Sequence, residues 1–190
     1  FYLIYTIVYT NRNRFKDTHN FMVTASDPKG PWSDPIPLNK MGFDPSLFHD
    51  PDGTKWLVNM LFDYRLDHKR FGGVGVQQYD PETKKLVGPV YNVFKGSDKG
   101  TTEGPNIFYH DGWYYLVTAE GGTEFKHCVT MCRSEKLTGP YEISPYVPVL
   151  TSFGKDVQLK RAGHGQIIQG KDGNWYMAHL CSRSLDNCSI

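Results

Sequence analysis

The feature that most constrains the fold of this chain is a hairpin signal that occurs three times, about 60 residues apart. Each copy consists of Asp-Gly, a gap of at most two residues and Trp, and it stands between two apolar runs. Asp-Gly in that setting predicts a tight β-hairpin, because the turn needs positive φ values that Asp and Gly tolerate. The three tryptophans, 57 and then 62 residues apart, are Trp56, Trp113 and Trp175.

A second set of turn signals, rich in Pro and Gly, lies between these hairpins, at residues 26–32, 80–89 and 134–141. We interpret them as the turns between the third and fourth strands of each unit. Four-stranded units of about 60 residues are typical of a β-propeller. The fold prediction is therefore all-β, a β-propeller of four-stranded blades, with an open solenoid or two stacked sheets as the alternative. The 190 residues hold a little over three such units, so we expect an incomplete ring.

Composition excludes some classes of partner. With 21 basic and 20 acidic residues and a net charge of +1, the chain offers no electrostatic case for nucleic acid or a membrane surface. No apolar run reaches the roughly 18 residues of a membrane span. The spacing of Cys128, Cys132, Cys181 and Cys188 does not match common zinc sites, even with His127 nearby. We interpret the cysteines as buried free thiols, and leave disulfides and the cellular compartment open.

Three titratable residues lie where the first strand of each unit is expected to begin. Counting back eight positions from each turn aspartate gives Asp44, Glu103 and His164. Aligning instead on the proline of DPSLF and GPNIF moves Glu103 by one position, which would reverse its facing. First strands line the channel of a propeller, so we expect the three groups to converge on one site. Singly, each is equally consistent with an ordinary loop residue.

Paired carboxylates that differ in protonation at neutral pH are typical of glycoside hydrolysis. In this interpretation Glu103 has a raised pKa and protonates the leaving oxygen, while Asp44 keeps that proton in place by like-charge interaction. His164 bridges the carboxylates or contacts the sugar. Stacking faces for a sugar ring would come from aromatics near strand ends, and blade packing is their alternative role; the candidates are Phe43, Phe62 and Trp113.

Four segments closely resemble glycoside hydrolase family 43, in its β-xylosidase and α-L-arabinofuranosidase branch. They are FDPSLFHDPDGTKWLVNMLFD, TEGPNIFYHDGWYYLVTAEGGT, KHCVTMCRSEKLTGPYE and RAGHGQIIQGKDGNWYMAHL. The resemblance implies a five-bladed propeller that cleaves xylan-derived sugars with inversion. Its general acid would be Glu103 of TEGP, its pKa-tuning residue Asp44 of FDPS, and its pocket histidine His164 of RAGHG. Phe62 stands where the family often has a substrate-contacting Trp.

Two family motifs do not occur in the sequence. They are a first-blade motif resembling DPS, which carries the general base, and a GRET-like motif, which carries a substrate-binding Arg. We therefore expect residues 1–190 to be one partial propeller domain, a fragment without its first blade and closing segment, and inactive alone.

The expected partner is a xylo- or arabino-oligosaccharide, and no cofactor is expected. A calcium ion near His164, as in some relatives, is not predicted, and oligomeric state is left open. Two other functions stay open, namely an endo-arabinanase of the same fold and a non-catalytic carbohydrate-binding propeller.

Overall fold

The computed structural model describes residues 1–10 and 15–183 of the chain, and the regular structure within these ranges is entirely β. The chain divides into two compact units, residues 1–95 and 96–190, and each is described by itself. Across the described ranges, no helix is long and apolar enough to span a membrane.

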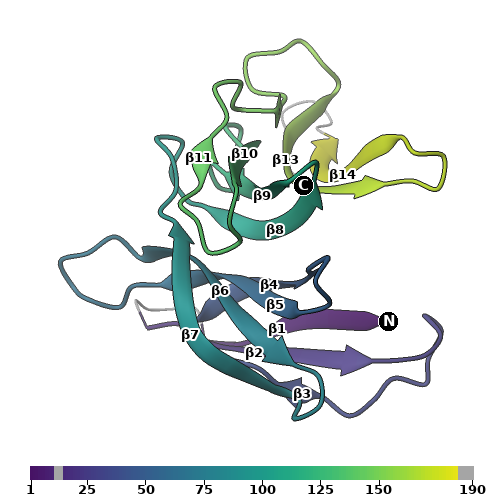
Figure 1. The fold of residues 1–190 in the computed structure, drawn as a ribbon. Helices are drawn as coiled ribbons and strands as arrows, with labels where there is room; N and C mark the ends of the chain where they lie inside the picture. Colours follow the sequence, from purple (N-terminus) through teal and green to yellow (C-terminus); the bar gives the residue numbers. More distant parts are fainter. Residues whose placement is uncertain (11–14, 184–190) are drawn as a thin grey trace. The chain divides into compact units, whose positions relative to one another are not determined.

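The first unit contains two antiparallel sheets (Figure 1). The three-stranded sheet consists of β1 (Tyr2–Thr10), β2 (Asp17–Thr24) and β3 (Ile36–Pro37). The four-stranded sheet is a meander of β4 (Gly42–His49), β5 (Lys55–Phe62), β6 (Phe71–Asp80) and β7 (Lys85–Phe94). Their shared core is built on Met22, Ile36 and Tyr79, with Leu47 of β4 packed against it.

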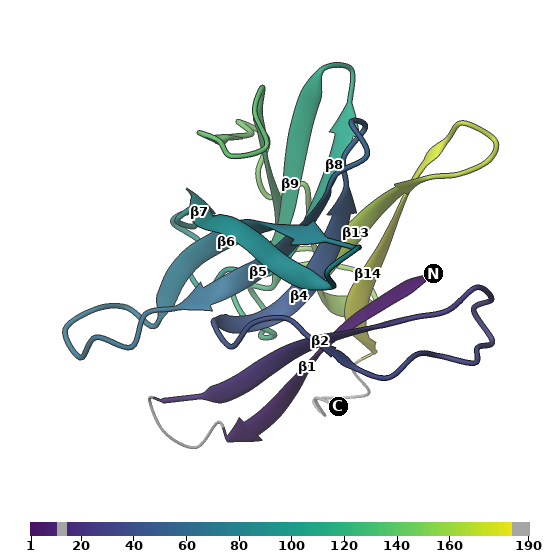
Figure 2. The ribbon, with the colours of Figure 1, turned by 60° about the horizontal axis from the view of Figure 1, so that its bottom comes forward.

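The second unit also contains two antiparallel sheets. Its larger sheet consists of β8 (Glu103–His110), β9 (Trp113–Glu120), β10 (Cys128–Ser134) and β11 (Glu142–Ile143), with β12 (Leu150–Thr151) added to β10. A separate long hairpin, whose strands lie side by side in Figures 1 and 2, consists of β13 (Leu159–Gln169) and β14 (Trp175–Arg183). Strand β13 packs against β8, β9 and β10, so the hairpin belongs to the same compact unit.

All three Asp-Gly hairpins predicted from the sequence are present, as β4–β5, β8–β9 and β13–β14. At the tightest of them Asp111 and Gly112 both have positive φ, 46° and 83°, as a two-residue hairpin turn requires. The second set of signals marks the β2–β3, β6–β7 and β10–β11 connections. The all-β class and the four-stranded antiparallel unit are therefore confirmed.

The cysteine interpretation is correct for two residues and wrong for a third. Cys128 and Cys132 are free and buried in the second unit. Cys181 is free but exposed, because it lies on β14, most of whose residues are exposed. Cys188 lies outside the described residues.

Candidate active site

The first strands of the three hairpins share one irregularity, a β-bulge, which lies near the start of β4 and β8 and in the middle of β13. In each case two residues of the first strand stand opposite one residue of the second. The first bulged residue has a left-handed backbone in all three strands: φ is 51° at Asp44, 55° at Gly104 and 50° at His164. Bulges of this kind redirect side chains, and they are frequent beside active sites.

The bulges fix the alignment that the sequence left ambiguous. Asp44, Gly104 and His164 are equivalent, so Glu103 is equivalent to Phe43 and lies one position earlier. The alignment on proline is correct, and the count of eight residues is wrong for Glu103. The reason is that the β8–β9 turn has two residues where the other two hairpin turns are longer.

Two of the bulged residues carry side chains that strain this backbone. A left-handed conformation is uncommon outside glycine, although Asp and His adopt it more readily than most residues. Such strain persists only where the surrounding structure enforces it, and it gathers at functional sites. Asp44 and His164 are therefore the positions at which the backbone itself points to function.

In the second unit the structure brings the Glu103 segment and His164 together. A Cβ atom placed on Gly104, the residue after Glu103, would stand 2.4 Å from Nε2 of His164 and within 2.8 Å of two ring carbons. The imidazole thus lies directly on the backbone that carries Glu103. Glu103 itself is half-buried, and it pairs across the sheet with Ala119.

A second histidine supports the first, and the sequence analysis considered it only as a metal ligand. His127 is 4% exposed, and its ring lies against Gly163, where a Cβ would stand 2.5 Å away. Its Nδ1 donates to the carbonyl oxygen of Arg161 over 2.9 Å. Burial, with a smaller contribution from the charge of His164, lowers the pKa of His127. The lowered pKa favours the neutral form of His127, and its ring packs against the bulged part of β13.

Arg161 is a further residue that the sequence analysis missed, although it opens the RAGHG segment. Its φ of 56° marks a second bulge in β13. The guanidinium lies over the ring of Phe125, 4.8 Å from its centroid, with Nη2 3.9 Å from a carboxylate oxygen of Glu124. This geometry holds a positive charge three residues before His164 in the same strand.

In the first unit Asp44 follows the first ring of an aromatic row. The centroids of Phe43 and Phe62 are 5.4 Å apart, and Tyr64 continues the row at 5.7 Å from Phe62. The structure therefore brings together two of the predicted sugar-stacking residues. The backbone just before them is anchored, since Thr18 Oγ1 donates to the carbonyl oxygen of Gly42 over 2.8 Å.

Trp113, the third aromatic candidate, lies elsewhere. It stands at the turn end of the β8–β9 hairpin, whereas Glu103 stands at the opposite end. Over the eight residues of β8 that separation is roughly 23 Å. The guanidinium of Arg133 covers the indole ring at 4.3 Å from its centroid. The structure therefore does not bring Trp113 together with Glu103, because the indole lies at the other end of the strand.

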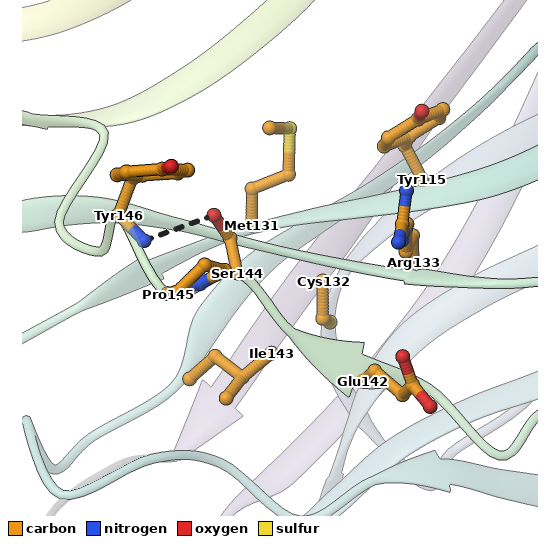
Figure 3. A pocket seen from close by; sticks show the side chains of 9 residues that line it. All are labelled: Tyr115, Met131, Cys132, Arg133, Glu142, Ile143, Ser144, Pro145 and Tyr146. Atoms are coloured by element: carbon orange, nitrogen blue, oxygen red, sulfur yellow. Dashed lines mark hydrogen bonds between the residues drawn. The ribbon is translucent and has the colours of Figure 1, made fainter.

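A pocket of about 310 Å³ lies among β9, β10 and β11 in the second unit (Figure 3). Its lining includes Tyr115, Arg133, Glu142 and Tyr146, and none of the residues predicted for the active site. The chemistry predicted from the sequence therefore belongs to the bulged strands and not to this pocket. Among residues 1–10 and 15–183, no group of three or more His, Cys, Asp or Glu side chains is arranged to hold a metal ion.

Comparison with known proteins gives consistent results. The family model described as glycosyl hydrolases family 43 matches residues 1–190. The chain is 51% identical over 186 residues to xylosidase/arabinosidase 43B of Humicola insolens, covering 96% of this chain and 34% of that protein. It is 47% identical over 189 residues to xylan 1,3-β-xylosidase of a Vibrio species, covering 98% and 35%.

A solved structure agrees with the fold. The crystal structure of xylan β-1,4-xylosidase from Bacillus halodurans C-125 superposes with a TM-score of 0.95 at 53% identity, over 97% of this chain and 36% of that one. The four-stranded antiparallel sheets are thus blades of a β-propeller of the glycosidase class. The chain belongs to glycosyl hydrolase family 43. It spans about a third of the length of the relatives it matches.

Proposed function

We propose that the complete protein removes xylose, arabinofuranose or both from xylan-derived oligosaccharides by an inverting mechanism. The support is membership of family 43 together with relatives named xylosidase and arabinosidase. The observation that carries the proposal is local. Glu103 directly precedes a β-bulge, and the ring of His164 packs against Gly104, the next residue. This is a carboxyl group on a backbone that cannot easily move.

Glu103 is the proposed general acid. It would give its proton to the glycosidic oxygen as the bond from that oxygen to the anomeric carbon breaks. A water molecule attacks the same carbon from the opposite face of the ring, and a second carboxylate takes up its proton. The product has an inverted anomeric centre, and the site is reset when the base releases its proton to solvent and Glu103 takes one up from solvent.

Asp44 is the proposed residue that orients Glu103 and tunes its pKa, the role that the family resemblance implies. The strained backbone of Asp44 supports a function beyond building the blade, since residues of this kind adopt φ values near 51° at a cost. His164 is proposed to hold Glu103 or to contact the sugar. Phe43 and Phe62 are proposed to offer apolar surface to the substrate.

The general base lies outside the sequence in this proposal. Residues 1–190 alone are accordingly expected to show no turnover of xylosides or arabinofuranosides. Hydrolysis by this purified segment, at a rate above that of a Glu103→Ala version of it, would contradict the proposed division of the site.

The decisive experiment removes the acid from the complete natural chain. Glu103→Ala should lower kcat by about 10²–10⁴-fold on substrates with poor leaving groups, such as xylobiose, because these need protonation. Activated aryl xylosides, whose leaving groups depart without a proton, should be affected far less. Glu135→Ala is the matched control, since Glu135 is exposed in the turn between β10 and β11. Equal losses on both substrate classes would rule out Glu103 as the acid.

Endo-arabinanase activity is the second candidate. A more distant relative, 27% identical over 142 residues, is named an extracellular endo-α-(1→5)-L-arabinanase. Product size separates the two functions. An exo-acting enzyme releases monosaccharides from linear arabinan or xylan oligomers from the start, whereas an endo-acting enzyme releases oligomers first. A protein that binds these oligomers without turning them over would instead be a non-catalytic propeller.

A further inference from the structure

The second unit contains a carboxylate that the proposed mechanism does not use. Glu120, the last residue of β9, has no exposed surface at all. Its Oε1 accepts hydrogen bonds from the backbone N–H of Ser97 over 3.0 Å and from Oγ1 of Thr102 over 2.7 Å. Its Oε2 accepts one from Oγ of Ser97. All three donors come from the segment that leads into Glu103.

A buried carboxylate is costly unless hydrogen bonds compensate for its lost hydration, so its position calls for a reason. The two other hairpins offer the comparison. Glu120 directly follows Ala119, the cross-strand partner of Glu103; in the first unit the equivalent residue is Leu61, and in the β13–β14 hairpin it is Cys181. The blade itself therefore accepts an apolar side chain here. The carboxylate occurs in the strand pair that carries Glu103.

The geometry points to Glu120 as the residue that positions the proposed general acid. Thr102 immediately precedes Glu103 in the chain, and Ala119 lies opposite Glu103 across the sheet. The hydrogen bond from Thr102 to Glu120 thus links the segment just before Glu103 to the strand that lies opposite Glu103 in the sheet. This inference rests on the proposed role of Glu103 as general acid.

The segment before Glu103 has a strained backbone, and two further contacts lie along it. Thr101 has a strained backbone with φ of 36°, and the N–H of Gly121 donates to the carbonyl oxygen of Gly100 over 2.9 Å. The charged neighbours on this segment, Lys99 and Asp98, pair with each other at 2.7 Å. If Glu120 were absent, the strained turn would relax, and the carboxyl group of Glu103 would shift from the leaving oxygen.

The experiment uses three test variants and one control variant of the complete natural chain. Glu120→Leu copies Leu61, the equivalent residue of the first unit, and removes all three hydrogen bonds. Thr102→Val keeps the shape of the side chain and removes the one bond adjacent to Glu103. Glu120→Gln is the conservative variant, because its amide oxygen can still accept from Ser97 N–H and Thr102 while its NH₂ faces Ser97 Oγ. Glu135→Gln, at an exposed position, is the matched control for loss of charge.

We expect Glu120→Leu and Thr102→Val to lower kcat about 10- to 100-fold on xylobiose, with KM little changed, because a displacement near 1 Å is enough for such a loss. Activated aryl xylosides should lose much less, and Glu120→Gln should restore the kcat on xylobiose to within about 3-fold of the parent. If Glu120→Leu fails to fold, Thr102→Val carries the test, since it leaves the buried carboxylate with its two bonds to Ser97.

Two outcomes separate failure of this inference from failure of the proposed function. A leaving-group-dependent loss in Glu103→Ala, combined with equal or no loss on both substrates in Thr102→Val and Glu120→Leu, overturns the positioning role alone. A Glu103→Ala variant without leaving-group dependence overturns both. The same selective loss in all three of these variants, with recovery in Glu120→Gln, supports the inference.

Discussion

The contact between Gly104 and His164 allows one prediction to be worked out from the structure. In the substitution Gly104→Ala the new Cβ would stand 2.4, 2.7 and 2.8 Å from three atoms of the imidazole ring. Real Cβ contacts of that length do not occur, so the ring or strand β8 has to move. The backbone adds a second cost, because φ at Gly104 is 55°. An L-residue in the left-handed region costs about 1–2 kcal/mol, and overpacking costs about 1–3 kcal/mol more.

A matched glycine separates these two costs. Gly112 also has a positive φ, 83°, but no atom lies within 4 Å of a Cβ placed there. Gly112→Ala should therefore lose about 1–2 kcal/mol of unfolding free energy through the backbone alone, whereas Gly104→Ala should lose about 2–5 kcal/mol. For a domain of this size, each kcal/mol by which Gly104→Ala is less stable than Gly112→Ala should lower its Tm further by roughly 2–4 °C.

The assay is thermal unfolding of the two glycine variants, of His164→Ala and of the double variant Gly104→Ala/His164→Ala. Because the double variant removes the clashing ring, it should be at least about 1 kcal/mol more stable than the sum of the single effects. The ring that Gly104→Ala displaces is also the proposed partner of Glu103, so kcat on xylobiose should fall, while Gly112→Ala leaves it unchanged. Equal destabilisation by the two glycine substitutions, or strict additivity in the double variant, would refute the contact.

Two further predictions concern titration. Burial holds the pKa of His127 below 6.5, so as the pH falls this histidine is protonated in the unfolded chain before it is protonated in the folded chain. The contribution of neutral His127 to the free energy of unfolding is therefore complete above pH 6.5 and is lost as the pH falls through the lowered pKa. His127→Asn, which keeps a donor for the Arg161 carbonyl, should therefore reduce the drop in Tm between pH 7.5 and pH 5, and an unchanged drop would contradict this; His49, whose pKa is also lowered, remains as a common background. Burial raises the pKa of Cys132 to about 12, so a thiol reagent at pH 8 should label exposed Cys181 in the native protein and leave Cys132 unlabelled, as peptide mapping would reveal.

The fold was accessible from the sequence because its signals are local. Asp-Gly followed by Trp defines a turn and the strand after it, and three copies at one spacing define the blade. Periodic local signals of this kind need no knowledge of distant contacts. The proposed roles of Asp44 and Glu103 likewise depend on two short motifs, FDPS and TEGP.

The sequence did not reveal which residues occupy equivalent places in successive blades. A hairpin with a two-residue turn and one with a longer turn can carry the same Asp-Gly signal, so counting from the turn misplaced Glu103 by one residue. The distance between Trp113 and Glu103 could not be predicted for a related reason. The sequence placed Trp113 near a strand end but did not show whether it shares an end of the hairpin with Glu103. In the structure the indole lies at the turn end, and Glu103 lies at the opposite end. The side chains of His127, Arg161 and Glu120 contact residues 18–37 positions away in the sequence, and no pattern in the sequence predicts these contacts.

The three bulges also suggest why the family can place different chemistry on one repeated strand. A bulge needs one left-handed residue, and glycine meets that need without strain, as Gly104 does. Asp44 and His164 hold the same conformation at a cost in strain, which agrees with the functional roles proposed for them. In β8 the functional group, Glu103, instead precedes the bulge, and glycine at the bulge leaves room for the imidazole that β13 brings against it. Glycine at position 104 and histidine at position 164 therefore depend on each other, because a side chain at position 104 would enter the space that the imidazole fills.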